Sequence, residues 1–207
     1  MKKWLLIGAA AVALLVIVAV VVVHLQLSGA LSGVERTVRP GDAMPPFSLT
    51  DYDGNTHTLE QYAGKIVVLD FCSHKCPFSV GVDPHTAALS HQYADNDEVV
   101  FLGIDSHYDT THEEIRAYAE EAGLPHPIVR DPENRYADAV GALVTPDFYV
   151  IDADGVLAYR GAFDNRLRPD NEGSRPYVAD AIEALLTGGE VSPDHVPSWG
   201  CTIKRAS

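Results

Sequence analysis

Cysteine and basic residues are both scarce in this chain. Its 207 residues include 3 cysteines, and 15 lysines and arginines stand against 29 acidic residues, which gives a formal net charge of −14. Three thiols are too few for a disulfide framework, and a domain of this length can form a core without one. A strongly acidic globular part is a poor partner for nucleic acid or anionic lipid. The sequence has no internal repeat and no low-complexity tract, so we expect a single globular domain.

The longest hydrophobic run lies near the N-terminus. It extends from Trp4 to Val23, roughly the length of about 20 residues that spans a bilayer as a helix. Lys2 and Lys3 precede the run and no further lysine or arginine occurs before Arg36, which predicts a cytoplasmic N-terminus. A cleaved signal peptide is the alternative, but its apolar region is usually about 7–15 residues long and ends in a small-x-small cleavage site. We therefore expect an uncleaved single-pass anchor.

These features divide the chain into four parts. We expect a transmembrane anchor at residues 1–27, a linker at 28–39, a globular domain at 40–189 and a tail at 190–207 that carries Cys201. The domain and tail would then lie at the cell membrane on its extracytoplasmic, periplasmic side. Thiols there meet an oxidising environment and tend toward disulfides unless something reduces them.

Strand and helix patterns alternate along the domain. A hairpin with an Asp-Gly turn opens it, Thr111 and Glu114 form a capping-box pattern, and Asp83-Pro84 has the form of an N-cap followed by a first helical residue. We expect strands at 47–50, 56–59, 66–71, 99–105, 127–129, 147–152 and 156–159, and helices at 83–93, 111–123, 134–140 and 177–186. This alternation predicts a three-layer α/β sandwich with a mixed central sheet.

The sequence Cys72-Ser-His-Lys-Cys76-Pro77 lies where an apolar strand ends and a helix can begin. Proline suits the first turn of a helix. A thiol at a helix N-terminus is biased toward the thiolate, which is both a nucleophile and a metal ligand, and a nearby cation such as Lys75 has the same effect. Two thiols this close can also form a disulfide. The motif therefore predicts thiol chemistry, either redox or metal binding.

Further short motifs are spread over the domain and the tail. They are Phe47-Ser-Leu-Thr, Tyr62-Ala-Gly-Lys-Ile-Val-Val, Val144-Thr-Pro146, Phe148-Tyr-Val-Ile-Asp-Ala-Asp-Gly155 and Gly200-Cys-Thr-Ile-Lys204. Together with the cysteine motif they resemble the thioredoxin-fold redoxins, a group that includes AhpC/TSA-type peroxiredoxins and membrane-anchored thiol–disulfide oxidoreductases. The resemblance covers roughly residues 40–186, and the late Gly-Cys-x-Ile-Lys resembles a peroxiredoxin-like bacterial subfamily. It implies a thioredoxin-like fold in which Pro146, after Thr145, is a cis-proline that faces the cysteines and helps to hold the substrate chain.

The motif and the resemblance predict a membrane-anchored thiol–disulfide oxidoreductase that needs no cofactor. The Cys72 thiolate would attack a substrate disulfide and Cys76 would resolve the mixed disulfide. Lys75 and the helix N-terminus would stabilise the thiolate, and Pro146 would position the partner. The partners would be protein thiols or disulfides and an upstream reductant or oxidant. We expect Cys201 to approach the motif as an auxiliary thiol.

A copper-binding function is one alternative. Three residues separate the two cysteines, as in Sco-type copper chaperones, and soft thiolates suit Cu(I). Thr145-Pro146 stands where those proteins carry a distant histidine. The ligands of this alternative would be Cys72, Cys76, His74 and Cys201.

A thiol peroxidase that uses Cys76 is the other alternative. Ser73-x-x-Cys76 matches part of a peroxide-site pattern, but the upstream proline is absent and Thr145-Pro146 occupies the region of the usual activating arginine. In the plainest interpretation, the cysteine pair is a structural disulfide, His74 is a solvated loop residue, Thr145-Pro146 is an ordinary turn and Cys201 is a spectator.

Overall fold

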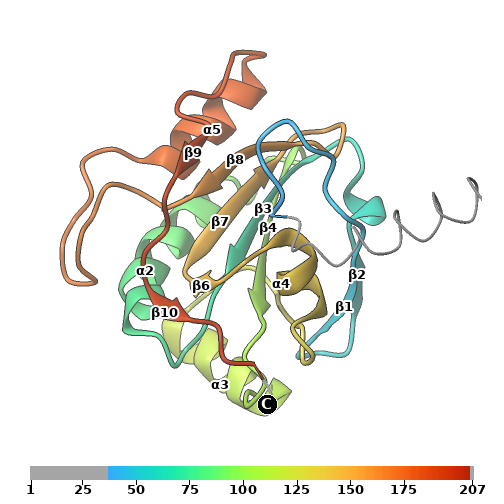
Figure 1. Ribbon diagram of the computed structural model, residues 1–207, viewed down its shortest axis with the longest axis vertical. Helices are drawn as coiled ribbons and strands as arrows, with labels where there is room; N and C mark the ends of the chain where they lie inside the picture. Colours follow the sequence, from blue (N-terminus) through green and yellow to red (C-terminus); the bar gives the residue numbers. More distant parts are fainter. Residues whose placement is uncertain (1–36, 206–207) are drawn as a thin grey trace, which may run out of the picture. The chain divides into compact units, whose positions relative to one another are not determined.

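The computed structural model describes residues 37–205 (Figure 1). The predicted anchor at residues 1–27 and most of the predicted linker lie outside the described residues. Within residues 37–205, no helix combines the length and the hydrophobicity needed to cross a bilayer. Val38, at the end of the predicted linker, is buried in the core of the domain, and its N–H donates to the Val140 carbonyl at 3.2 Å.

A mixed sheet of eight strands forms the centre of the domain, as predicted (Figure 1). Its strands, in spatial order, are β2 (Thr56–Thr58), β1 (Ser48–Asp51), β5 (Ile128–Arg130), β4 (Val99–Asp105), β3 (Ile66–Phe71), β7 (Asp147–Ile151), β8 (Leu157–Gly161) and β9 (His195–Val196). β3 pairs in parallel with β4 and antiparallel with β7. The predicted N-terminal hairpin, β1 and β2, extends one edge of the sheet.

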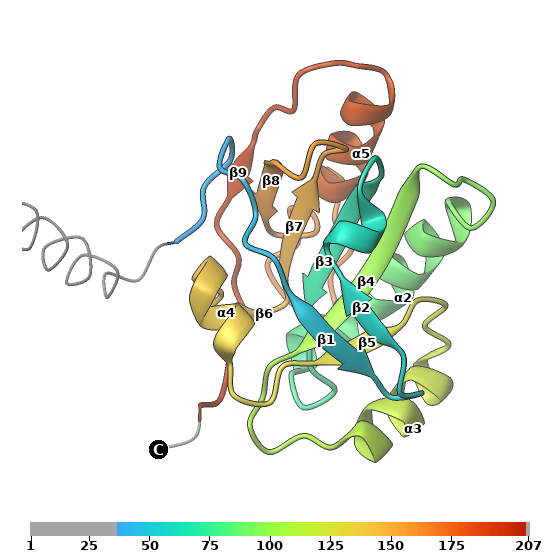
Figure 2. The same ribbon diagram turned by 90° about the vertical axis from the view of Figure 1, so that its right-hand side faces the viewer.

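Helices cover both faces of this sheet (Figure 2). They are the short 3-10 helix η1 (Glu60–Tyr62) and the α-helices α2 (Pro77–Gln92), α3 (His112–Ala122), α4 (Arg135–Val140) and α5 (Tyr177–Leu186). Figure 2 shows α4 on one side of the sheet and α2, α3 and α5 on the other. The three-layer α/β arrangement is therefore confirmed.

The side chains of β3 alternate between two hydrophobic cores. Leu69 and Phe71 pack in the cluster on the α4 side, whereas Val68 packs on the side of α2 and α5. Because successive side chains of a strand point to opposite faces, Asp70 and then Cys72 continue the row of Val68. The Cys72 N–H still donates to a carbonyl of β4 at 3.0 Å, so the strand geometry reaches this residue.

Helix α2 differs from the sequence-based expectation. It is one continuous helix that begins at Pro77 and runs through Pro84, so the prediction of an N-cap at Asp83 is wrong. Asp83 lies buried inside the helix, where the Tyr118 hydroxyl of α3 donates a hydrogen bond to it. Proline removes one helical hydrogen bond. The helix tolerates this loss because most helical stability comes from packing of the apolar face.

The tail after α5 is folded against the domain. It forms β9 beside β8, and then β10 (Cys201–Thr202), which pairs antiparallel with β6 (Val144–Thr145) in a second, two-stranded sheet. Neither tail strand was predicted, because two residues carry no periodic hydrophobic pattern. Ile203, the next residue, is 1% exposed in the core cluster on the α4 side. The tail is therefore part of the domain's packing.

Candidate active site

Cys76 occupies the N-terminus of α2. It is the N-cap residue in an extended conformation, and Pro77 follows at the first helical position, where proline forfeits no helical hydrogen bond. The Cys76 carbonyl accepts the N–H of Val80 at 3.0 Å. The residue therefore lies beside the free N–H groups of the first turn, whose partial positive charge favours a thiolate.

The segment Thr145–Pro146 lies across from this sulfur. Its peptide bond is cis, which confirms the expectation that the resemblance gave for Pro146. The Cys76 thiol donates to the Thr145 carbonyl at 3.0 Å. Thr145 is fully buried, and its hydroxyl has no other hydrogen-bond partner in the part of the chain that the structure describes. The hydroxyl is thus free to donate to the sulfur when Cys76 is a thiolate.

The tail brings Cys201 to the same place. Within the β10–β6 pair, Cys201 lies opposite Thr145, whose carbonyl accepts the Cys76 thiol, and the Cys76 and Cys201 thiols shift each other's pKa. Gly200 makes this approach possible, because a Cβ atom there would lie 2.0 Å from the Thr145 carbonyl oxygen. A glycine immediately before the cysteine is therefore a steric requirement of the site.

The two thiols have opposite pKa shifts. Burial acts to raise the pKa of Cys76, but hydrogen bonds from the Cys201 thiol, from Thr145 and from the backbone N–H of Ser79 outweigh it, and the pKa is lowered. Burial, followed by the hydrogen bond to Cys76 and the charge of Cys76, raises the pKa of Cys201 to about 11. Cys76 therefore ionises first, while Cys201 keeps its proton. The arrangement makes Cys76 the nucleophile of the pair.

No hydrogen bond joins the Cys72 side chain to Cys76 or Cys201 within residues 37–205. Its side chain is 4% exposed and packs in a cluster with Ile115 and Ile128, between the sheet and helices α2 and α3. Burial, followed by the charge of Asp70, raises the pKa of Cys72 well above its usual value. These features favour Cys76 over Cys72 as the attacking thiol, in contrast to the expectation from the sequence. The alternation along β3 directs its side chain into the core, and Cys76 takes the helix N-terminus instead.

Lys75 and His74, in the loop before α2, contact groups other than the cysteines. The Lys75 ammonium donates to the Asp109 carbonyl at 2.7 Å and forms ion pairs with Asp109 and Glu114 at 3.5 and 3.6 Å. The His74 ring lies 5.7 Å from the Tyr118 ring. Burial, followed by the charge of Lys75, lowers the pKa of His74. Neither side chain hydrogen-bonds to a cysteine within residues 37–205.

Two buried carboxyl groups near Cys76 were not recognised from the sequence. Burial, followed by the charges of Asp83, Asp147 and Cys76, raises the pKa of Asp70 well above its usual range. Burial also raises the pKa of Asp83 to about 7. Asp70 therefore keeps its proton to a higher pH than an exposed carboxyl group does, close to Cys76. The available signal was an acidic residue inside the otherwise apolar run at 66–71.

The structure also describes the residues of the two alternative functions. Within residues 37–205, no group of three or more His, Cys, Asp or Glu side chains is arranged to hold a metal ion. The copper ligand set is divided, because Cys72 is enclosed in its own hydrophobic cluster. For a peroxide site, the Ser73 hydroxyl accepts the N–H of Lys75 at 3.2 Å, and the buried Arg160 guanidinium is bound to the Asp147 carboxylate.

Several known proteins are similar to this chain in sequence and in fold. The sequence model described as "AhpC/TSA family" matches residues 40–160. The thioredoxin-like protein YneN of Bacillus subtilis is 29% identical over 76% of this chain and 88% of its own length. The thiol-disulfide oxidoreductase ResA of Geobacillus thermodenitrificans is 30% identical over 58% of this chain and 68% of its own length. The crystal structure of an uncharacterized conserved protein from Geobacillus kaustophilus superposes with a TM-score of 0.76 at 33% identity, covering 83% of this chain and 94% of that one.

Proposed function

Because the chain belongs to the AhpC/TSA family, we propose that it is a thiol–disulfide oxidoreductase in which Cys76 attacks and Cys201 resolves. Its relatives include named thiol-disulfide oxidoreductases, so an oxidoreductase activity follows from family membership. One observation carries the assignment of the sulfurs. Cys76, at the N-terminus of α2, donates to the carbonyl of Thr145, the residue that lies opposite Cys201, and the Cys201 thiol helps to lower the Cys76 pKa.

The reaction takes two exchange steps. The Cys76 thiolate attacks one sulfur of a substrate disulfide, which forms a mixed disulfide and releases the other substrate sulfur as a thiolate. The Cys201 thiolate then attacks the Cys76 sulfur, which forms a Cys76–Cys201 disulfide and releases the second substrate thiolate. The substrate disulfide has gained two electrons and the protein's two thiols have lost them. An external dithiol reverses the two steps and restores the protein, and the same steps run backwards oxidise a substrate dithiol.

The pKa values of the pair suit this order of events. Part of the upward shift of the Cys201 pKa comes from its hydrogen bond to Cys76 and from the charge of Cys76. Both causes disappear once the Cys76 sulfur is bound in a mixed disulfide, so Cys201 becomes easier to deprotonate when it is needed. The substrate thiolate released in the first step can accept the proton of the Cys201 thiol.

The side chains around the sulfurs have positioning roles in this proposal. Thr145 supplies the carbonyl that accepts the Cys76 thiol and a hydroxyl that can donate to the Cys76 thiolate, and the cis-proline Pro146 follows it in the same segment. Lys75 acts indirectly, because its ammonium is bound to Asp109. The substrate would be a protein disulfide or dithiol, as the family resemblance implies, and no cofactor takes part in the two steps.

Trapping with glutathione disulfide tests the assignment. In the full-length Cys201→Ser variant, we expect a stable glutathione adduct on Cys76, identified by mass spectrometry of alkylated peptides. The wild type and the matched control Cys72→Ala should pass through this adduct to an internal disulfide. An adduct on Cys72, or an adduct on Cys76 that Cys72 resolves, would refute the proposed order.

We also propose that the site works outside the cytoplasm at the membrane surface. The support is the apolar run from Trp4 to Val23 and the two lysines before it, which together favour an uncleaved anchor. Protease added to spheroplasts should remove the domain while intact cells protect it, and fractionation should leave the uncut chain with the membrane. Recovery of a shortened soluble chain would contradict the anchor.

A further inference from the structure

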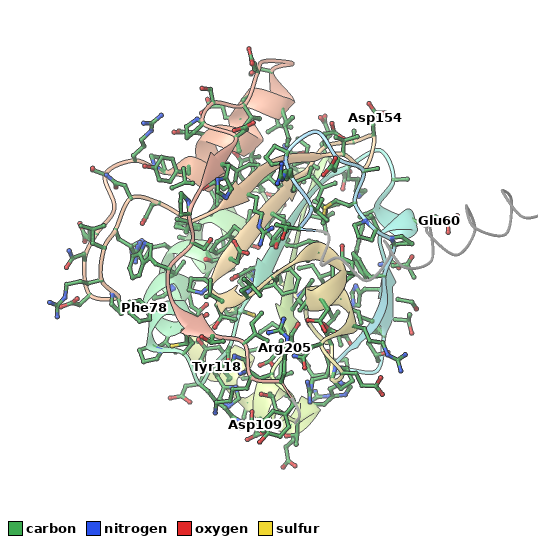
Figure 3. All side chains as sticks on the ribbon, viewed as in Figure 1. Glu60, Phe78, Asp109, Tyr118, Asp154 and Arg205 are labelled. Carbon is green, nitrogen blue, oxygen red and sulfur yellow. The ribbon has the colours of Figure 1, made fainter. Side chains whose placement is uncertain are left out.

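The nucleophilic sulfur is covered by the protein's own tail. Cys76 is 0% exposed. Trp199 of the tail packs edge-on against Phe78 of the first turn of α2, with ring centroids 4.9 Å apart. Phe78 is labelled in Figure 3. The cavity that remains beside Trp199, Phe78 and Pro146 has a volume of only about 10 Å³. In this conformation Cys76 therefore presents no surface to an external disulfide.

The segment that covers the sulfur is held at both ends. We call residues 197–202 the strap. Before it, β9 pairs with β8, and the Val196 carbonyl accepts the Ala162 N–H at 3.1 Å. After it, Ile203 is buried in the core, and the Lys204 carbonyl accepts the Tyr108 N–H at 3.1 Å. Figure 1 shows the tail passing from β9 to β10 across the end of the domain where α2 begins. The strap is thus a short span between two fixed points.

The strap itself is bound to the domain by one side-chain hydrogen bond and one short strand pairing. The Ser198 hydroxyl donates to Asp147 at 2.6 Å, and two residues of β10 pair with two residues of β6. In this pairing the strap is an extended chain that runs antiparallel beside Thr145, with a cysteine presented to Cys76. A partner polypeptide that delivers its own cysteine to Cys76 needs the same edge of β6 and the same approach.

We propose that the strap occupies the binding position of the partner's polypeptide, and that the partner presents an extended aromatic-Gly-Cys segment in its place. This inference rests on the proposed function. The aromatic residue two positions before the cysteine would fill the place of Trp199 beside Phe78. The glycine is required because any Cβ directly before the cysteine would strike the Thr145 carbonyl, as it would at Gly200. Displacement of the strap then exposes Cys76, and its return brings Cys201 back to resolve the mixed disulfide.

Activated peptides test this proposal on a full-length chain in which Cys76 is the only cysteine (Cys72→Ala with Cys201→Ser). The probe is a synthetic peptide with the sequence of residues 197–204, its cysteine bound as a mixed disulfide to 2-nitro-5-thiobenzoate. Attack by Cys76 forms the protein–peptide disulfide and releases the coloured thiolate, whose absorbance gives the rate. Matched peptides replace the tryptophan by alanine, or the glycine by valine.

Trp199→Ala in this background should speed the reaction with the native-sequence peptide about tenfold or more, the factor that corresponds to about 1.4 kcal/mol. The matched control, Leu167→Ala, removes an exposed apolar side chain from a neighbouring loop and should leave the rate unchanged. In the Trp199→Ala chain, each altered peptide should react about tenfold more slowly than the native-sequence peptide. Gly200→Ala, which displaces the strap by a different clash, serves if Trp199→Ala lowers the melting temperature too far.

Three results would overturn the inference or its premise. Equal rates for all the peptides would show that the site does not select an aromatic-Gly-Cys segment. An unchanged rate in both Trp199→Ala and Gly200→Ala would show that the strap does not guard Cys76. Failure of Cys76 to react with 5,5′-dithiobis(2-nitrobenzoate) in any folded variant would instead refute the proposed function itself.

Discussion

Substitution of Cys72 tests whether this cysteine is structural or catalytic. Its thiol packs against Ile115 and Ile128 and is nearly inaccessible, so a hydroxyl in its place would be buried among apolar groups. A buried hydroxyl without a partner costs about 1–3 kcal/mol in proteins. We therefore expect Cys72→Ser to lower the free energy of unfolding by about 1–3 kcal/mol and to leave exchange at Cys76 unchanged.

Cys72→Ala separates polarity from lost volume. It removes the sulfur and introduces no polar atom, so its cost is the smaller transfer and cavity term of about 1 kcal/mol. Urea unfolding of the full-length variants, followed by far-UV circular dichroism, gives the two free energies. Reaction of the folded chains with glutathione disulfide gives the exchange rates. The expected order of stability is wild type, then Cys72→Ala, then Cys72→Ser.

Two outcomes would refute this reasoning. If Cys72→Ala abolished thiol–disulfide exchange while the urea unfolding curve stayed the same, Cys72 would be a catalytic thiol despite its burial. If Cys72→Ser were as stable as the wild type, the site would not be the apolar environment that its neighbours define. Iodoacetamide labelling supplies an independent check, because Cys72 should be alkylated only after unfolding.

Three further variants probe the groups around the site and the hairpin. Burial raises the pKa of Asp83 to about 7, so the stability that its protonated form gives is lost as pH rises from about 4 to about 7. Between about pH 5 and pH 9, the free energy of unfolding in urea should therefore fall by about 3 kcal/mol more in the wild type than in Asp83→Asn. Ile203→Ala truncates a fully buried side chain of the tail and should lower the free energy of unfolding by about 2–5 kcal/mol. Iodoacetamide should then label Cys76 faster, and an unchanged labelling rate would mean that Ile203 does not hold the tail. Burial opposes the shift of Asp51, but hydrogen bonds from His57 and Asn55 lower its pKa to about 2. The contribution of Asp51 is present above about pH 4 and is lost as pH falls through about 2, so Asp51→Asn should lower the free energy of unfolding at neutral pH by about 2 kcal/mol, and equal stability in urea would contradict this.

The sequence predicts the elements whose signals are local. Thr111 and Glu114 form the capping box that their spacing indicates, and α3 ends at Gly123 in the left-handed conformation. The apolar run at 66–71 is the central strand. Asp83-Pro84 misleads because an N-cap signature has no local mark that distinguishes it from a proline inside a helix. The packing of α2 on the sheet decides whether the helix begins at Asp83 or continues through Pro84. A short stretch of sequence does not report this tertiary packing.

The candidate site is predictable only in part. Pro146 and Cys201 were recognised by resemblance, and the structure places both beside Cys76. The sequence favours Cys72 as the attacking thiol and the structure favours Cys76, although the alternation along β3 already assigns Cys72 to the face covered by α2. Extending that two-residue period past Asp70 gives this assignment. The pairing of the tail with β6 depends on contacts between residues distant in sequence, which no local pattern reports.

The most direct test of the account is the identity of the disulfide in the oxidised protein. The full-length chain is oxidised, alkylated and digested without reduction, and the linked peptides are identified by mass spectrometry. We predict one disulfide that joins Cys76 to Cys201, with Cys72 recovered as a thiol that is alkylated only after unfolding. A disulfide between Cys72 and Cys76, with Cys201 left as the free thiol, would contradict the account.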